Sequence, residues 1–258
     1  MIKIGIAGAS GKMGSTIASL CVKENDLKIT LLTEKNGHNS IGKELYNCKI
    51  TDNLENNVNN IDVFIDFTTP AATLTSLKII EKAKKSIVIG TTGFNNDELK
   101  EIKDVSKVIP VVLSSNYSIG INVMIKILKE AVKIMKDDYD IDIVESHHRM
   151  KKDAPSGTAM TLAKTIIEQK NIDFEKNVIF GRQGRDNERP RDQLGVFAVR
   201  GGGVIGEHTV IMASMGDKIE IKHTAFSRET FAAGAIKAAK FIINQKPGLY
   251  SMNDVLGI

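Results

Sequence analysis

Two adjacent histidines and three cationic side chains stand close together in the middle of the chain, where residues 145–158 read Glu-Ser-His-His-Arg-Met-Lys-Lys-Asp-Ala-Pro-Ser-Gly-Thr. A histidine transfers protons near neutral pH, and a lysine ammonium can donate one. The last four residues precede an apolar pattern at helical spacing, so their amides are expected at a helix N-terminus, which attracts anions. The stretch predicts proton transfer on a small anion with more than one carboxylate or phosphate.

The cationic and polar residues of this stretch suggest separate tasks. His147 and His148 are consecutive, and consecutive side chains of an extended segment point to opposite sides, so we expect different roles for them. Lys151 is placed to protonate a product. Lys152 and the amides of the Pro-Ser-Gly-Thr turn are expected to receive carboxylates, and Ser156 can also cap the helix.

A glycine-rich turn, Gly-Ala-Ser-Gly-Lys-Met-Gly at residues 8–14, follows an apolar strand at 3–7 and precedes a helix at 15–23. A second strand at 27–33 ends in Glu34-Lys35. Glycines allow the backbone to turn tightly, so that a pyrophosphate can reach the helix N-terminus. The order of strand, glycines, helix, strand and acid predicts dinucleotide binding.

The pair Glu34-Lys35 bears on the choice of cofactor. The Glu34 carboxylate is expected to accept hydrogen bonds from an adenosine ribose, which favours NADH, whereas Lys35 can pair with a 2′-phosphate. We therefore predict use of both NADH and NADPH, with a modest preference for NADH.

Strands and helices alternate through the first half of the chain, which predicts a parallel, doubly wound sheet. In such sheets, ligands bind at the loops that follow the carboxyl ends of the strands. Three loops of small polar residues qualify, at 8–14, 90–93 and 114–117. The predicted cofactor-binding residues are Gly8, Ala9, Ser10, Gly11, Lys12, Met13, Glu34, Lys35, Gly90, Thr91, Thr92, Ser114, Ser115, Asn116 and Tyr117.

The second half predicts a different, α+β architecture with an open antiparallel or mixed sheet. Helices are expected at 122–136, 159–168 and 231–243, and strands at 139–144, 177–181, 196–199, 206–213 and 219–224. A sheet with one open face is often covered by another subunit, so we expect an oligomer. His208 and His223 lie on these strands and are expected to be structural. Arg182, Arg185 and Arg189 fit either a mobile anion-binding loop or a solvated surface.

Composition excludes several other classes of protein. The 258 residues are 42% hydrophobic, and 35 basic residues nearly balance 31 acidic ones without a basic run, which argues against nucleic-acid or membrane-surface partners. No apolar run approaches the ~18 residues of a membrane span, and the N-terminus lacks a signal peptide, so a cytoplasmic protein is expected. Cys21 and Cys48 have no metal spacing and are read as reduced thiols; no metal site is expected.

Taken together, these motifs resemble the 4-hydroxy-tetrahydrodipicolinate reductase (dihydrodipicolinate reductase) family. The matching segments are residues 8–14, 64–68 (Phe-Ile-Asp-Phe-Thr), 90–93 (Gly-Thr-Thr-Gly), 145–159, 206–209 (Gly-Glu-His-Thr) and 254–256. The resemblance implies reduction of the cyclic dicarboxylate 4-hydroxy-tetrahydrodipicolinate to tetrahydrodipicolinate by NADH or NADPH, on the diaminopimelate route to lysine.

The resemblance also implies domains and roles. A nucleotide domain at 1–118 and 228–258 would enclose a substrate and tetramerisation domain at 119–227. His147 matches the proton donor or acceptor, Lys151 the other proton donor, and His148 and Gly157-Thr158 the substrate contacts; residues 8–13, 34, 90–92 and 114–117 match cofactor contacts. Some members carry Arg in place of Thr69, which here argues against a strong NADPH preference.

Two other functions remain compatible with the nucleotide-binding half. One is a different two-domain nicotinamide dehydrogenase that acts on an amino or oxo acid such as aspartate or homoserine. The other is a redox sensor that binds NAD(H) without turnover. Neither requires the proton-donor set of residues 145–158, which favours the reductase.

Overall fold

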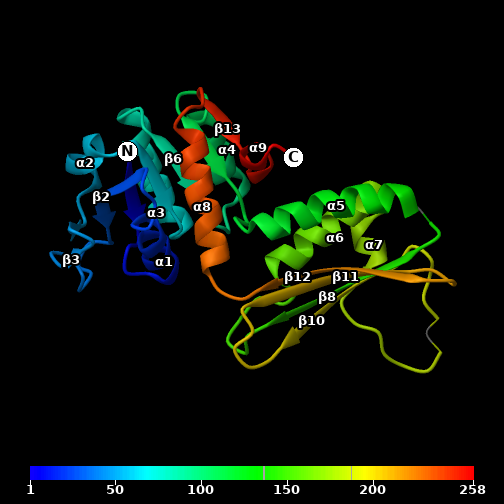
Figure 1. Cartoon of the computed structure of the whole chain (residues 1–258). Helices are drawn as coiled ribbons and strands as arrows, with labels where there is room; N and C mark the ends of the chain where they lie inside the picture. Colours follow the sequence, from blue (N-terminus) through cyan, green and yellow to red (C-terminus); the bar gives the residue numbers. More distant parts are fainter. Residues whose placement is uncertain (136, 187) are drawn as a thin grey trace. The chain divides into compact units, whose positions relative to one another are not determined.

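The computed structural model describes residues 1–135, 137–186 and 188–258, and the described chain divides into two compact units (Figure 1). The first unit comprises Met1–Ile119 and Arg228–Ile258, and the second comprises Gly120–Ser227. Residue 136 of the helix expected at 122–136, and residue 187 of the loop between 182 and 194, lie outside the described residues.

Within the described residues, the first unit is built on an eight-stranded sheet with the order β13-β7-β6-β5-β1-β2-β4-β3. All neighbouring strands are parallel except β3 and β4, which confirms the predicted doubly wound architecture. The strands are β1 (Ile2–Ala7), β2 (Leu27–Thr33), β3 (Glu44–Leu45), β4 (Cys48–Thr51), β5 (Val63–Asp66), β6 (Ser86–Ile89), β7 (Pro110–Leu113) and β13 (Gly248–Tyr250).

Helices cover both faces of this sheet, because its central strands are apolar on both sides. One face packs against α1 (Lys12–Cys21), α8 (Glu229–Ile242) and α9 (Met252–Leu256). The other packs against α3 (Pro70–Lys82) and α4 (Asn96–Val105), together with the short α2 (Leu54–Asn57) and the 3-10 turn η1 (Val58–Asn60).

The C-terminal segment completes the core of the first unit. Helix α8 packs on α1, β5 and β6, and β13 pairs with the edge strand β7. A side chain at Gly234 of α8 would place a Cβ atom 1.8 Å from the Tyr117 carbonyl oxygen, so only glycine permits this approach. The last 31 residues are therefore an integral part of the nucleotide-binding type of fold.

The second unit holds a mixed sheet, as predicted, whose order within the described residues is β12-β11-β8-β10-β9. Strand β11 pairs antiparallel with both β8 and β12, whereas β10 pairs parallel with both β8 and β9. The strands are β8 (Asp140–His147), β9 (Val178–Ile179), β10 (Leu194–Arg200), β11 (Gly206–Ala213) and β12 (Lys218–Ala225). The helices are α5 (Ile119–Met135), α6 (Gly157–Lys170) and α7 (Phe174–Asn177).

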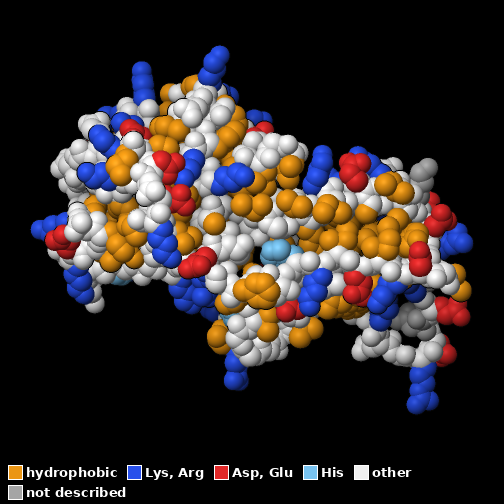
Figure 2. Space-filling model, in the orientation of Figure 1, with side chains coloured by type: hydrophobic (Ala, Val, Ile, Leu, Met, Phe, Trp, Pro, Cys, Tyr) orange, Lys and Arg blue, Asp and Glu red, His pale blue; other side chains and the backbone are white. Residues whose placement is uncertain are grey.

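Helices α5 and α6 cover one face of this second sheet through a separate hydrophobic core. The strands nevertheless keep exposed apolar side chains, such as Val199 and Ile219, which are 51% and 42% exposed. On the face shown in Figure 2, hydrophobic side chains also gather along α5, whereas Lys and Arg are dispersed among acidic and uncharged residues. No helix of the described chain is long and apolar enough to cross a membrane.

Asp142 anchors part of the arginine-rich loop to β8. Arg182 contacts both Asp142 oxygens, at 2.7 and 3.0 Å, and Arg189 donates to Oδ1 at 2.7 Å. Burial favours protonation of Asp142, but the two guanidinium groups outweigh it and lower the pKa of this carboxyl. Arg182 and Arg189 are therefore held in ion pairs with Asp142, and they form neither a mobile anion-binding loop nor a solvated surface. Arg185 is exposed.

Candidate active site

Strand β8 carries the first residues of the candidate site. The alternating pattern predicts its end at residue 144, but the strand continues to His147. Because side chains two residues apart share a face, Glu145 and His147 point the same way, and both are buried. His148 takes the opposite side and is half-buried, so the two histidines lie in different environments, and the different roles expected for them stay a prediction.

The Glu145 carboxylate is fully buried, and each of its oxygens accepts hydrogen bonds from two groups of the described chain. Arg200 donates to both oxygens, at 2.7 and 2.8 Å. The Ser156 amide donates to Oε1 at 2.9 Å, and Nδ1 of His147 lies 2.6 Å from Oε2. Burial raises the pKa of Glu145, but these hydrogen bonds outweigh it and hold the pKa below its ordinary value.

His147 lies between this carboxylate and several cations. Burial lowers the pKa of His147 most strongly, Glu145 opposes that effect, and the charges of Lys151 and Arg200 add to the lowering. The net shift is downward, which favours the neutral imidazole near pH 7.

His208, expected to be structural, lies against His147 in an edge-to-face arrangement with ring centroids 5.2 Å apart. Its Nε2 atom lies 3.0 Å from the Ser156 hydroxyl. Burial, followed by the charge of His147, lowers the pKa of His208 to about 4. His208 therefore supports the site as a neutral ring.

Ser156 caps α6, as predicted, because its hydroxyl accepts from the Ala159 amide at 3.2 Å. Its own amide donates to Glu145, and the residue is 2% exposed. The expectation that amides of this turn receive substrate carboxylates therefore does not hold for the Ser156 amide. Gly157 is exposed and Thr158 is half-buried.

The two lysines differ in their surroundings. Nζ of Lys151 lies 2.9 Å from Oδ1 of Asp153, and the Lys151 side chain is 23% exposed. Lys152 is exposed. The Asp153 carbonyl oxygen also accepts from Arg200 at 2.6 Å, so the loop that bears the lysines is tied to the Glu145 cluster.

In the first unit, the glycine-rich turn forms a cradle of the kind that a pyrophosphate requires. Gly8 has φ +60°, and its carbonyl oxygen accepts from the Gly11 amide at 2.8 Å. A Cβ atom at Gly14 would lie 2.1 Å from that oxygen. Helix α1 begins at Lys12 rather than at the predicted Ser15, because the turn is already closed at Gly11, which caps the helix.

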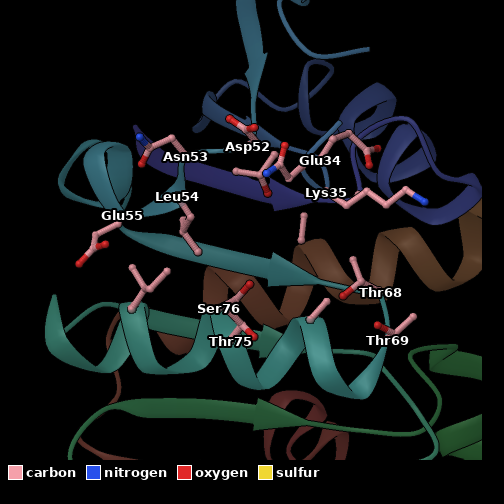
Figure 3. Close-up of a pocket in the computed structure, with 16 residues that line it drawn as sticks. Glu34, Lys35, Asp52, Asn53, Leu54, Glu55, Thr68, Thr69, Thr75 and Ser76 are labelled. Atoms are coloured by element: carbon pink, nitrogen blue, oxygen red, sulfur yellow. The ribbon is translucent and has the colours of Figure 1, made fainter. Parts of the chain in front are cut away.

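Glu34 at the end of β2 reaches back to this turn, where its Oε1 atom accepts from the Ser10 amide at 2.8 Å. A cavity of about 660 Å³ lies beside it (Figure 3). Figure 3 shows Glu34 and Asp52 on one side of the cavity and Thr75 and Ser76 of α3 on the opposite side. The lining residues are Ala7, Gly8, Thr33, Glu34, Lys35, Asn36, Asp52, Asn53, Leu54, Glu55, Thr68, Thr69, Ala72, Thr75, Ser76 and Ile79.

A buried carboxyl that the sequence analysis did not single out organises the next two loops. Asp66 ends β5, and its Oδ1 atom accepts from the amide and hydroxyl of Thr68, at 3.0 and 2.6 Å, and from the Thr73 hydroxyl at 3.1 Å. The Thr91 hydroxyl lies 2.8 Å from that of Thr73. Burial raises the pKa of Asp66, and the hydroxyl hydrogen bonds oppose that rise.

The remaining predicted cofactor residues occupy different settings. Thr92 and Ser115 are exposed, and Gly90 packs so closely on Phe67 that a Cβ atom would lie 2.0 Å from its ring. The Ser114 hydroxyl donates to the Asn116 carbonyl oxygen at 3.0 Å.

Tyr117 is buried, and its hydroxyl donates to the Ile89 carbonyl oxygen at 2.8 Å. Burial raises the pKa of Tyr117 well above its ordinary value. Its phenol therefore belongs to the core of the first unit.

The described residues contain no group of three or more His, Cys, Asp or Glu side chains that could hold a metal ion. The glycine cradle, Glu34 and the adjoining cavity do fit a dinucleotide, because they supply close backbone approach and a carboxylate beside the turn.

Comparison with known proteins decides the family. The N-terminal family model of dihydrodipicolinate reductase matches residues 2–117, and the C-terminal model matches residues 120–256. The chain belongs to the dihydrodipicolinate reductase family. This assignment confirms the resemblance and the expected oxidoreductase class, and it decides against the other dehydrogenase and the redox sensor.

Curated members of the dihydrodipicolinate reductase family match over the whole chain. The 4-hydroxy-tetrahydrodipicolinate reductases of Geotalea uraniireducens and Trichlorobacter lovleyi are both 42% identical, over 100% of this chain and of their own length. Among solved structures, the dipicolinate-bound dihydrodipicolinate reductase of Paenisporosarcina sp. TG-14 shares the fold with a TM-score of 0.80, at 24% identity and 98% coverage of both chains.

Arg200, His208 and Asp66 are the site-supporting residues that sequence reasoning missed. Arg200 and His208 act through partners distant in sequence, Glu145 and Ser156, whereas Asp66 acts both through the nearby Thr73 and through the more distant Thr91. One local signal was available for Asp66, since an acid ends an apolar strand and two threonines follow after Phe67. Nothing in the sequence near Arg200 indicated its partner.

Proposed function

We propose that this chain reduces 4-hydroxy-tetrahydrodipicolinate to tetrahydrodipicolinate with NADH or NADPH, in the diaminopimelate route to lysine. The observation that supports it most directly is the cluster at the end of β8, where Glu145, His147 and Lys151 lie within the stretch that resembles the family's site. Whole-chain identity of about 40% with curated reductases of that name agrees with this proposal.

The first unit is the proposed dinucleotide-binding domain, with boundaries at 1–118 and 228–258. The turn at residues 8–13 receives the pyrophosphate, Glu34 and Lys35 the adenosine ribose, and residues 90–92 and 114–117 the remainder of the cofactor. The cradle that a Cβ atom at Gly14 would fill supports this assignment. When bound, the nicotinamide supplies the hydride.

The second unit, Gly120–Ser227, corresponds to the proposed substrate-binding and oligomerisation domain, for which we predict the bounds 119–227. The substrate carries two carboxylates, and the cationic Lys152 with the Gly157 and Thr158 amides at the α6 N-terminus suits one of them. His148 and Ser156 complete the proposed substrate contacts, with Ser156 acting through its hydroxyl and the cap rather than through its amide.

Lys151 is the proposed proton donor. Loss of the 4-hydroxyl group as water leaves a ring carbon conjugated with an imine, and hydride addition at that carbon gives an electron-rich enamine that needs a proton. The Lys151 ammonium can supply it, and His147 assists from the buried cluster. The neighbouring cations also stabilise negative charge on the ring, so positioning and electrostatics dominate over covalent chemistry.

For the cofactor, we propose dual use with a modest NADH preference. The residues that line the cavity include three carboxylates (Glu34, Asp52 and Glu55) and one cation (Lys35). This excess of negative charge weakens the binding of a 2′-phosphate modestly but does not prevent it. The test is kcat/KM for both cofactors. A preference for NADPH above about a hundredfold would contradict the proposal.

We further propose a cytoplasmic homotetramer. The open face of the second unit's sheet carries apolar side chains, such as the 51% exposed Val199, that suit burial against other copies. Light scattering coupled to size exclusion should give four times the mass of one chain. A monomer at micromolar concentration would refute the oligomer without affecting the proposed reaction.

The decisive experiment follows NADH oxidation with the freshly made condensation product of pyruvate and aspartate semialdehyde. Aspartate semialdehyde alone and homoserine serve as competing substrates. We expect turnover only with the condensation product. Turnover with an aspartate-derived compound alone, or tight NADH binding without any turnover, would overturn the proposed function.

A further inference from the structure

A continuous set of hydrogen bonds connects Arg200, Glu145 and His147 in the second unit. Glu145 accepts from Arg200 and from the Ser156 amide, and these donors favour its ionised form. An ionised carboxylate has no proton to donate. The hydrogen between Glu145 Oε2 and His147 Nδ1, which lie 2.6 Å apart, therefore belongs to Nδ1.

Proton placement at Nδ1 determines what the other ring nitrogen can do. In a neutral imidazole with hydrogen on Nδ1, the Nε2 atom carries a lone pair and can only accept. The described part of the chain gives Nε2 no hydrogen-bond partner, and the His147 side chain keeps 10% of its surface exposed. A Cβ atom at Gly206 would lie 3.0 Å from Nε2, so glycine at this position keeps that edge of the ring open.

The charged and titratable groups around His147 come from every element packed on it. Glu145 lies on the same strand, Arg200 on β10, His208 on β11 and Lys151 in the following loop. The positive charges of Arg200 and Lys151 disfavour an imidazolium at His147, and His208 is held neutral. These surroundings keep His147 neutral in the substrate-free protein.

We infer that Glu145, held by Arg200, is a positioning residue that locks His147 with its proton on Nδ1, so that Nε2 faces the substrate and accepts the ring proton that is lost when the 4-hydroxyl group leaves as water, while Lys151 is the sole donor. The inference rests on the proposed function for its substrate, and it divides the donor and acceptor tasks between the two residues. Glu145 itself does not touch the reacting atoms in this arrangement.

The first test reads the tautomer directly and needs no activity. Ring ¹⁵N chemical shifts of His147 in the substrate-free protein, assigned with His147→Gln, should show a protonated Nδ1 and an unprotonated Nε2 at pH 7.5. In Glu145→Gln the two forms should be mixed, because a glutamine amide can either accept from Nδ1 or donate to it. Glu207→Gln is the matched control, since Glu207 lies on β11 beside Ser146 and pairs at the surface with Lys222. A proton on Nε2 of the wild-type protein would overturn the inference.

The second test is the pH profile of kcat. A residue that must accept a proton loses activity as the pH falls through its pKa, whereas a donor loses it as the pH rises. We expect His147 to produce the acidic limb, identified by its absence in His147→Gln. Glu145→Gln should move this limb to lower pH, because removal of the carboxylate removes the interaction that favours the imidazolium. Its kcat should fall at least about tenfold, with substrate KM changed less than about threefold. A His147-dependent limb on the basic side would contradict the inference.

A further variant, Gly206→Ala, provides a test if Glu145→Gln fails to fold because Arg200 is left unpaired. Gly206→Ala places a methyl group against Nε2 without removing any charge. It should lower kcat about tenfold while the ¹⁵N shifts still report a proton on Nδ1. Wild-type kcat in Gly206→Ala would exclude Nε2 from the reaction. If no variant or wild-type protein turns over the condensation product, the proposed function fails, and the ¹⁵N shifts still decide the tautomer.

Discussion

The ammonium of Lys151 lies 2.9 Å from the carboxylate of Asp153, two residues along the same loop. The proposed proton donor is therefore paired with an anion of its own chain. Burial raises the pKa of Asp153, but the hydrogen bond from Lys151 outweighs that effect and keeps the carboxyl ionised. A substrate carboxylate that approaches Lys151 must compete with this internal anion.

Replacement of Asp153 should therefore tighten substrate binding. The Asp153 side chain is 57% exposed, and an exposed ion pair contributes at most about 1 kcal/mol, or about fivefold in a binding constant. We expect Asp153→Asn to lower substrate KM by about two- to fivefold, with a smaller effect at high salt. Asp137→Asn, which removes an exposed carboxylate near Lys170 in the same unit, is the control and should leave KM unchanged. A higher KM in Asp153→Asn would show that Asp153 assists binding.

Lys151→Ala should reduce kcat by about a hundredfold or more, because general acid catalysis contributes about that much. The cofactor KM should stay within about twofold of wild type. Lys152→Ala retains the proposed donor and removes a proposed carboxylate contact, so it should raise substrate KM with a smaller loss of kcat. Steady-state kinetics with both substrates varied makes the comparison. An unchanged kcat in Lys151→Ala would exclude it as the donor.

Acid should destabilise the second unit through His208. Burial lowers its pKa to about 4 in the folded chain, below the ordinary 6.5. As the pH falls from 6.5 to 4, the unfolded chain binds a proton that the folded chain does not, so stability is lost over this window. The loss amounts to about 3 kcal/mol.

His208→Gln tests this prediction, because it removes the titrating group from a buried site, where His208 is 4% exposed. The variant should lose about 3 kcal/mol less than wild type between pH 7 and 4. Urea unfolding followed by circular dichroism provides the measurement, since the chain has no tryptophan. Equal pH dependence in the two proteins would show that His208 titrates normally.

Thr69→Arg should shift the cofactor preference toward NADPH. Thr69 lines the same cavity as Glu34 and Lys35, across from them in Figure 3, and a guanidinium there can pair with a 2′-phosphate. We expect kcat/KM for NADPH to rise about tenfold, with NADH changed less than about threefold. Thr161→Arg on α6 adds the same charge in the other unit and serves as control. Equal gains in the two variants would indicate long-range attraction only.

Asp66 should stabilise the fold as a hydrogen-bond acceptor more than through its negative charge. Asp66→Asn retains an oxygen for the hydroxyls of Thr68 and Thr73, and burial disfavours the charge that it removes. Its free energy of unfolding should stay within about 1 kcal/mol of wild type, whereas Asp66→Ala should lose about 2–4 kcal/mol. Thermal unfolding of both variants decides the matter. A larger loss in the Asn variant would show that the negative charge is needed.

Helices and strands whose apolar residues recur at regular spacing were predictable from sequence. Strand β2 has the predicted bounds, 27–33, and α3 (Pro70–Lys82) differs by one or two residues at each end from the helix that the sequence pattern predicts at 71–84. These segments are buried through their own side chains, so the local pattern contains the necessary information. The short strands β4 and β13 were missed because three or four residues become a strand only by pairing with a distant neighbour.

The proton-transfer cluster was predictable in composition but not in geometry. Residues 145–147 are polar, which indicated a loop, yet they form strand because Arg200 neutralises Glu145 from 55 residues away. The Ser156 hydroxyl was correctly predicted as a cap, since that role depends only on the next three residues. The Ser156 amide does not face a substrate carboxylate as predicted, because its acceptor, Glu145, is a buried anion at the end of β8 and not part of the loop.

The contact between Gly234 and the Tyr117 carbonyl joins two segments of the first unit that are separated by the whole second unit. This has a consequence for the order of folding during synthesis. Residues 120–227 form one uninterrupted segment and can close their core as soon as they leave the ribosome. The earlier-made N-terminal sheet must wait, with the surface that α8 will cover still exposed, until residues 228–258 arrive. The half of the protein that is translated first is therefore the half that is completed last.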